Sequence, residues 1–337
     1  MGKIPQGRPS LQVCCIIFRN SAEKWEKPLI KRSTKFLLLL FVVIVAGQEA
    51  AAGVQVEQVS PRCYALIGET SQRSPENLGN NATFGLIVTD RGLVLVDPGG
   101  SEKGAAELAQ TIAGINPQPV VLVINTGGQD HRWLGNHFWK ARGAKVIASE
   151  AAVADQRQRM DQQLQGLRRL VGEEGMAGSR PEFADQTFRD RLDLELGGVR
   201  IELHHAGPAH TPGDSYVWLP GQQVLFSGDI VYHDRLLGVG SQSDSRSWLS
   251  VFGQIEALNP GVVVPGHGRP GAFSQAKLET GEYLRLLRQR VGEFIQQGGT
   301  LDQIGMVDQS DFSQLEVFDQ LAGRNAHRVY QEMEFDF

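Results

Sequence analysis

Four short loops in this 337-residue chain carry a histidine or an aspartate directly after an apolar, strand-like run. They span residues 123–131, 206–214, 225–229 and 264–268. Imidazole and carboxylate side chains ligate metal ions and transfer protons, and loops held by a rigid sheet are where such groups concentrate. One histidine in a loop is more often a hydrogen-bonded surface residue. Four such loops in one chain predict a chemical site.

The four loops resemble the motifs of the metallo-β-lactamase superfamily, over roughly residues 54–290. In that family a strand leads into H-x-H-x-D-H, and G-H-T-x-G-[DH], S-G-D and G-H-G follow. The last three motifs are matched closely by residues 209–214, 227–229 and 266–268, and Asp97-Pro98-Gly99 matches a structural landmark. The resemblance implies a mixed α/β fold, a four-layer αββα sandwich with metal at one edge.

The first motif departs from the family pattern. Where Asn-Thr-His-x-His-x-Asp-His is expected, the chain has Asn-Thr-Gly-Gly-Gln-Asp-His at residues 125–131. Both leading histidines are absent, and we read the loop as one residue shorter. In the family those histidines and the His210 equivalent hold one metal, whereas the other metal takes the equivalents of the remaining ligands and a bridging aspartate, which here is Asp229.

Counting donors predicts one metal ion instead of two. The resemblance leaves the second site with Asp130, His131, Asp229 and His267, a shell suited to Zn²⁺, with Fe or Mn as alternatives. The first site keeps only His210, a weaker ligand candidate, and the shared Asp229. The metal would lower the pKa of a bound water to about 7 for attack on a carbonyl or phosphoryl centre.

We assign catalytic roles to Asp130 and His210. Having no metal of its own, His210 would orient the water, donate a hydrogen bond to a developing oxyanion or act as a general acid. Trp133, His233 and Arg235 are candidate substrate contacts, although Trp133 could equally be packing. His137 and His233 are also considered as replacements for a lost ligand, but positions behind the ligands or on the surface are the commoner outcome.

Periodicity predicts two strand-rich halves, each followed by helices, which favours two packed sheets covered by helices on both outer faces. We expect strands within residues 54–67, 82–96, 120–124, 145–148, 188–205, 216–226 and 262–264. Helices are expected from 101 to 115, 131 to 139, 149 to 172 and 245 to 258, and again from residue 274 onward. Residues 53–290 are predicted to form the main domain, with 291–337 as a C-terminal helical extension packed on it.

Residues 1–52 read as a targeting segment. Lys31, Arg32 and Lys35 precede an 11-residue apolar run, and Ala50-Ala51-Ala52 follows, which is the pattern of a secretory signal peptide cleaved near Ala52. The run is shorter than the roughly 20 residues that span a bilayer, although a retained membrane anchor is the alternative. We therefore expect a periplasmic or secreted protein with no stable membrane span after cleavage.

The remaining chain is acidic. Residues 1–52 hold eight of the 33 basic residues and three of the 38 acidic ones, which leaves a net charge of −10. An acidic surface argues against a nucleic-acid partner. The expected function is an exported metal-dependent hydrolase of an ester, lactone, thioester or amide bond in a small-molecule substrate. The alternative is a catalytically silent binding protein that lost its dinuclear centre. Nothing in the sequence indicates an oligomeric state.

Overall fold

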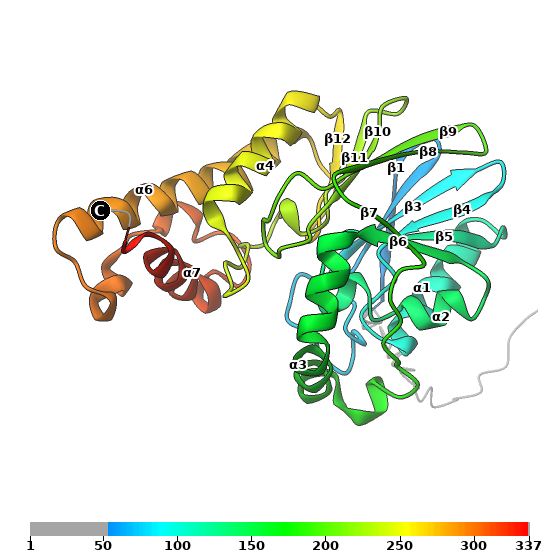
Figure 1. The fold of residues 1–337 in the computed structure, drawn as a ribbon, viewed down its shortest axis with the longest axis horizontal. Coiled ribbons are helices and arrows are strands. Elements are labelled where there is room, and N and C mark those ends of the chain that lie inside the picture. The colour runs from blue at the N-terminus through cyan, green and yellow to red at the C-terminus, as the bar shows by residue number, and fades with distance from the viewer. Residues whose placement is uncertain (1–52, 336–337) are drawn as a thin grey trace, which may run out of the picture. The chain divides into compact units, whose positions relative to one another are not determined.

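The computed structural model describes residues 53–335, so the predicted targeting segment lies outside the described residues. Two sheets form the centre of the fold (Figure 1). The first has the order β1 (Gln55–Ser60), β2 (Cys63–Ile67), β3 (Thr83–Thr89), β4 (Gly92–Val96), β5 (Val120–Asn125), β6 (Lys145–Ser149), β7 (Gln186–Phe188). The second has the order β12 (Val262–Val264), β11 (Val224–Phe226), β10 (Tyr216–Leu219), β9 (Val199–His204), β8 (Arg191–Leu196).

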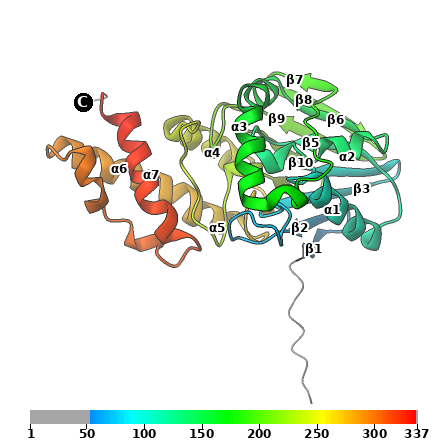
Figure 2. The same cartoon turned by 90° about the horizontal axis from the view of Figure 1, so that it is seen from below.

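Helices cover the outer face of each sheet, as Figure 2 shows from below. Beside the first sheet lie α1 (Glu102–Ile115), α2 (Asn136–Lys140) and α3 (Glu150–Gly175). Against the second sheet lie α4 (Ser245–Leu258) and α5 (Phe273–Ala276). Helix α6 (Tyr283–Gln296) packs on α4, α7 (Phe318–Met333) packs on α6, and both extend away from the sheets (Figure 1). The short helical segments η3 (Lys277–Glu282), η4 (Leu301–Met306) and η5 (Ser310–Phe312) connect these helices. The predicted αββα sandwich is confirmed.

Strand β4 illustrates why the apolar runs form buried strands. Side chains alternate between the two faces of a strand. Leu93 and Leu95 pack against the outer helices, whereas Val94 and Val96 pack between the sheets. All four are fully or almost fully buried. A strand covered on both faces requires an uninterrupted apolar run, and this is what the sequence supplies.

The helices begin at the capping residues that the sequence offers. Ser101, Ser149 and Asp244 each accept a hydrogen bond from the backbone N–H three residues later, and they start α1, α3 and α4. The single helix expected over residues 131–139 is instead two pieces, η1 (Asp130–Arg132) and α2. The interruption lies at Gly135, whose N–H donates to the Gly99 carbonyl and where a β-carbon would lie 2.3 Å from the Pro98 oxygen.

The C-terminal helices share a core with the second sheet. Leu284 of α6 and Val329 of α7 belong to the same buried cluster as Trp248 of α4 and Leu225 of β11. The side-chain amide of Asn325 donates to the Leu237 carbonyl, and its oxygen accepts from the Val239 N–H. How the chain divides between a domain and an extension stays a prediction. Among residues 53–335, no helix is both long and apolar enough to cross a bilayer.

Candidate metal centre

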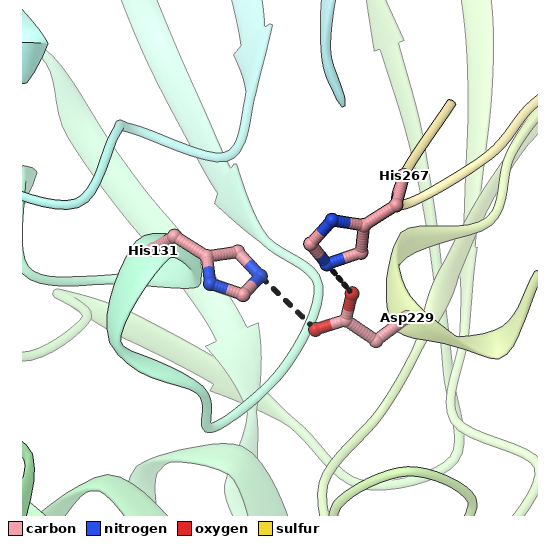
Figure 3. Close-up of side chains that lie close together, drawn as sticks. All are labelled: His131, Asp229 and His267. Carbon is pink, nitrogen blue, oxygen red and sulfur yellow. Dashed lines mark hydrogen bonds and ion pairs between the residues drawn. The ribbon is translucent and has the colours of Figure 1, made fainter. Parts of the chain in front are cut away.

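Three buried side chains converge at one edge of the two sheets, and Figure 3 shows them together. Nε2 of His131 lies 3.2 Å from Oδ2 of Asp229, and Nε2 of His267 lies 3.2 Å from Oδ1 of the same carboxylate. One ligand atom from each residue lies within 4.8 Å of the other two. Two imidazole nitrogens and one carboxylate form a donor set that suits Zn²⁺ or Fe²⁺.

Strand register explains why Asp229 and His267 meet. β11 and β12 are parallel neighbours, and Phe226 pairs with Val264 at their carboxyl ends. Asp229 and His267 each lie three residues beyond that pair, so both loops deliver their side chain at the same level. Gly228 permits the close approach: its φ is +52°, and a β-carbon there would lie 2.3 Å from Oγ1 of Thr126.

The short turn η1 (Asp130–Arg132) sends three consecutive side chains in different directions, because a 3₁₀ turn has about three residues per turn. His131 points to Asp229 and His267. The carboxylate of Asp130 instead pairs with Arg73, whose Nη2 lies 2.5 Å from its Oδ1. The structure therefore brings three of the four predicted main ligands together and leaves the Asp130 carboxylate outside the cluster.

The contacts favour reading the first loop without a deletion. In that register Gly127 and Gln129 take the places of the two leading histidines, His131 takes the place of the family aspartate, and Arg132 takes the last position. Residue type alone matches Asp130-His131 to the Asp-His pair of the motif. The direction in which each side chain points could not be read from residue type.

The role of Arg132, considered from the sequence only as a substrate contact beside the ligands, is the main feature that sequence reasoning missed. Its side chain is fully buried, and all five N–H groups have acceptors. It pairs with Asp97 at 2.8 Å and with Asp229 at 2.7 Å. Although burial alone would lower the pKa of Arg132, the carboxylates of Asp229 and Asp97 raise it above its ordinary value. The signal available in the sequence was an arginine directly after the Asp-His pair.

Asp229 is ionised in this environment. Burial opposes ionisation, but the charge of Arg132 and the contact with His131 hold the pKa of the Asp229 carboxyl well below its usual range. Asp97 supports the arrangement from the end of β4. Its Oδ1 accepts from the Thr126 N–H and its Oδ2 from the Thr126 hydroxyl, which fixes the start of the loop that carries His131.

The hydrogen bonds of His267 make its Nε2 an acceptor. Nδ1 lies 2.7 Å from the Asn81 carbonyl oxygen, which can only accept, and 3.2 Å from Nη1 of Arg235, which can only donate. The shorter contact places the proton on Nδ1. Burial holds the pKa of His267 well below its ordinary value, so the ring is neutral. A lone pair on Nε2 therefore faces the ionised carboxylate of Asp229. Two facing acceptors are the arrangement that a cation would stabilise.

His131 has two possible proton positions. Its Nδ1 lies 3.0 Å from Asp130 Oδ1 and 2.6 Å from Arg73 Nη2. With the Nδ1 proton directed at Asp130, the Nε2 lone pair is free for a metal, as in carboxylate–histidine–metal arrangements. With Arg73 donating to Nδ1, Nε2 carries the proton and donates to Asp229. A bound metal selects the first form. Burial opposes ionisation of Asp130, but Arg73 and His131 hold its pKa well below the usual range.

His210 lies beside the cluster in a shared pocket. Together with His131, His267 and Tyr232 it lines a cavity of about 220 Å³. Its Nδ1 donates to the Gly238 carbonyl at 2.8 Å, so its Nε2 is an acceptor. Burial lowers the pKa of His210, which favours the neutral ring. This form can accept a proton or orient a water, whereas the roles of acid and oxyanion donor require the disfavoured charged form.

The space of the missing first site is filled by protein groups. A β-carbon at Gly127 would lie 2.6 Å from Oδ1 of Asp214, and one at Gly128 would lie 1.8 Å from Oδ2 of Asp155. Asp155 pairs with Arg159, and Nη1 of Arg159 lies 3.5 Å from the amide oxygen of Gln129. A guanidinium therefore stands beside the loop from which the family's leading histidines extend.

The predicted substrate contacts fall in different places. Arg235 lines the pocket. Trp133 does not: it is fully buried, stacks on Phe183 and donates to Gln163, so it packs the base of α3. His233 is also fully buried and hydrogen-bonds through Nδ1 to the Arg269 carbonyl. Neither His233 nor His137 is among the side chains that line this pocket.

The chain is similar to known proteins over most of its length. The family model described as the metallo-beta-lactamase superfamily matches residues 79–267. A metallo-beta-lactamase type 2 from Bacillus sp. (strain 170) is 29% identical over 264 residues, which cover 72% of this chain and 95% of the relative. A linear primary-alkylsulfatase from Pseudomonas sp. (strain ATCC 19151) is 28% identical over 110 residues, 31% of this chain and 20% of the relative.

Among solved structures, a stereoselective inverting sec-alkylsulfatase from Pseudomonas sp. has the same fold. Its TM-score is 0.64 at 17% sequence identity, and the match covers 83% of this chain and 50% of that chain.

Proposed function

Because the chain belongs to the metallo-beta-lactamase superfamily, we propose that it is an exported hydrolase that uses a single metal ion. In this proposal His131, Asp229 and His267 hold the ion, and the bond cleaved is an ester, lactone, thioester or amide of a small molecule. One observation carries it: the Nε2 lone pair of neutral His267 faces the ionised carboxylate of Asp229 at 3.2 Å. A metal ion bound by both atoms would relieve the repulsion between the His267 lone pair and the carboxylate.

A single ion is favoured over two because the first site has too few donors. His210 and Asp229 remain, whereas Gly127 offers no donor and the Gln129 amide oxygen already lies near Arg159. Zinc is the metal we propose, with iron or manganese as alternatives that the same donors accept.

A bound divalent cation supplies Lewis acidity that brings the pKa of a coordinated water toward neutrality. The protein's own residues supply the rest. Neutral His210 faces the pocket with its Nε2 lone pair and accepts the proton of the attacking water. Arg132 fixes both oxygens of Asp229. Asp130 was predicted as a ligand and a catalytic residue, and here it acts through His131 by orienting that ring.

Export rests on the pattern in residues 1–52, a basic flank, an apolar run and a small-residue exit. We propose that the mature protein begins near Ala52 and acts in the periplasm or outside the cell.

A catalytically silent binding protein is the second candidate, and one observation favours it. Arg132 already satisfies both oxygens of Asp229, and Arg73 contacts Nδ1 of His131 at 2.6 Å. Two cationic side chains at the ligands reduce the negative charge available to a metal ion. The hydrolase is preferred because these contacts leave Nε2 of neutral His267 without a donor, 3.2 Å from the Asp229 carboxylate.

A chelation experiment on the purified full chain tests the hydrolase. Ester, lactone, thioester and amide substrates are assayed before and after treatment with a chelator, and again after zinc is added back. We expect turnover of one bond class, its loss on chelation and its return with zinc. Full turnover in the chelated protein, or none with any class in the zinc-loaded protein, would contradict the proposal.

A further inference from the structure

The pocket beside the candidate metal centre is lined by positive side chains. Arg73, Arg235 and Arg324 contribute to its wall, and no aspartate or glutamate among residues 53–335 does so. Three parts of the chain that lie far apart in the sequence supply them, and Arg235 comes from the loop after η2 (Gly228–Ile230). Arg73 follows β2, and Arg324 lies on α7, which also contributes Leu321 and Asn325. The charge of this pocket contrasts with the acidic composition of the chain.

The arginines at the site differ in how their charges are compensated. Arg73 pairs with Asp130, and Arg132 pairs with Asp97 and Asp229. Arg235 has only 8% of its surface exposed, and no carboxylate within residues 53–335 lies within ion-pair distance of it. Its Nη1 donates to the Ser71 carbonyl at 3.4 Å and lies 3.2 Å from Nδ1 of His267. Its buried Nε has no acceptor.

A buried charge without a partner costs free energy, and proteins seldom retain one unless a ligand compensates it. Guanidinium groups match oxyanions well, because their N–H groups form a planar fork that reaches two oxygens at once. An oxyanion in the pocket would supply the missing negative charge beside the Arg235 guanidinium.

We propose that Arg235 is the recognition residue for an oxyanion on the substrate, a carboxylate, sulfate or phosphate group held directly beside His267. This inference rests on the proposed function for the identity of the reaction, but not for the existence of the anion site. Arg324, exposed on α7, adds a second positive charge at the wall. The pocket thus selects small molecules whose anionic group lies next to the bond that is cleaved.

Direct binding of an anion tests the site without any turnover. The full chain is treated with a chelator, so that no metal can hold the anion, and is titrated calorimetrically with sodium sulfate and with sodium acetate at constant ionic strength. We expect saturable binding of at least one anion. Arg235→Ala should weaken it tenfold or more, and Arg235→Lys should weaken it less. The matched control is Arg91→Ala, an exposed arginine at a distant hairpin, which should bind like the unmodified chain.

Two outcomes would overturn the site: sulfate and acetate both fail to bind the unmodified chain, or Arg235→Ala binds them as well as Arg91→Ala does. Circular dichroism checks that each variant is folded. If Arg235→Ala does not fold, Arg235→Lys and the titration of the unmodified chain still decide, because equal affinities for these two chains would contradict a fork-shaped contact.

A pair of esters separates this inference from the proposed function. One is a neutral aryl ester, and the other carries a carboxylate beside the scissile bond. Arg235→Ala should lower the ratio of kcat/KM for the anionic ester over the neutral one at least tenfold. Arg235-dependent sulfate binding without hydrolysis of either ester, or of any substrate in the four-class assay, would leave the anion site standing and remove the hydrolase. Hydrolysis of both esters, with a ratio of kcat/KM that is unchanged in Arg235→Ala, would support the hydrolase and contradict the anion site.

Discussion

Nε2 of His267 and Oδ1 of Asp229 lie 3.2 Å apart, although each is a hydrogen-bond acceptor. The Asn81 carbonyl takes the only proton that the neutral His267 ring has, and Arg132 keeps Asp229 ionised. Backbone hydrogen bonds tie the loops after β11 and β12 together, from the Ser227 N–H to the Val264 carbonyl and from the Gly266 N–H to the Val231 carbonyl. A cation between them resolves the conflict, and His131 completes a set of three ligands.

Replacing His210 by Ala separates its role from metal binding. Because Nδ1 of His210 donates to Gly238, only Nε2 is free, and we expect it to act as a base. The variant should retain its metal and lose roughly 10²–10⁴-fold in kcat. Since burial lowers the pKa of His210 below 6.5, the acid limb of the kcat profile should lie below pH 6.5 in the unmodified chain. Unchanged turnover in His210→Ala would remove His210 from the mechanism.

Arg132 is expected to be a major contributor to stability. Arg132→Met leaves two buried carboxylates, Asp97 and Asp229, without their partner. Breaking a buried ion pair in this way costs about 3–5 kcal/mol of the free energy of unfolding. Urea denaturation of the chelator-treated protein measures it. Arg91→Met, at an exposed position, should change that free energy by less than about 0.5 kcal/mol, and an equally small change in Arg132→Met would contradict the role given to Arg132.

Gly127 stands where the family has the first of its two leading histidines, and we expect its replacement to lower the free energy of unfolding. The β-carbon of Gly127→Ala would lie 2.6 Å from Asp214, so we expect a loss of roughly 1–3 kcal/mol in the free energy of unfolding. Gly166 in α3 is the matched control, because a β-carbon there would meet no neighbouring group within 4 Å. There the same substitution should stabilise by up to about 1 kcal/mol. A tolerated Gly127→Ala would show that the loop can make room for a larger side chain.

Asp214 should give the stability a distinctive pH dependence. Burial, with a smaller contribution from the charge of Asp229, raises the pKa of Asp214 to about 8. Between about pH 4 and pH 8 the folded chain therefore holds a proton that the unfolded chain has lost. Stability contributed by Asp214 falls as the pH rises through this window, by at most about 1.4 kcal/mol per pH unit.

The comparison with Asp214→Asn isolates this contribution. The free energy of unfolding of the unmodified chain, minus that of Asp214→Asn, should fall from pH 5.5 to pH 7.5 and level off above pH 8. Denaturant titrations at four pH values measure it, and a difference that is constant with pH would be incompatible with a protonated Asp214.

Much of the fold could be predicted from the sequence because its signals are local. The unbroken apolar run at 93–96 requires a strand buried on both faces, and Ser101 and Ser149 are strong helix starts. The separation of η1 from α2 was missed because it depends on the Pro98 backbone, which lies more than 30 residues before Gly135 and contacts it only in the folded chain.

The site was predictable to the level of which loops meet, and less so for individual side chains. The meeting of Asp229 and His267 was predictable, because each lies the same number of residues beyond the end of one of two neighbouring parallel strands. Asp130 and His131 are adjacent in sequence, but only the His131 ring reaches Asp229, whereas the Asp130 carboxylate lies against the far ring nitrogen, 3.0 Å from Nδ1. Arg73 forms an ion pair with Asp130, and Arg132 forms one with Asp229. The partners of each pair are far apart in the sequence, so no local sequence pattern predicts these contacts.

Metal content of the purified full chain, measured by inductively coupled plasma mass spectrometry after dialysis, tests the central claim most directly. One metal ion per chain is expected in the unmodified protein and in His210→Ala, and less than about a tenth of that in His267→Ala and His131→Ala. Two ions per chain, none at all, or a full equivalent retained in His267→Ala would contradict a single ion held by His131, Asp229 and His267.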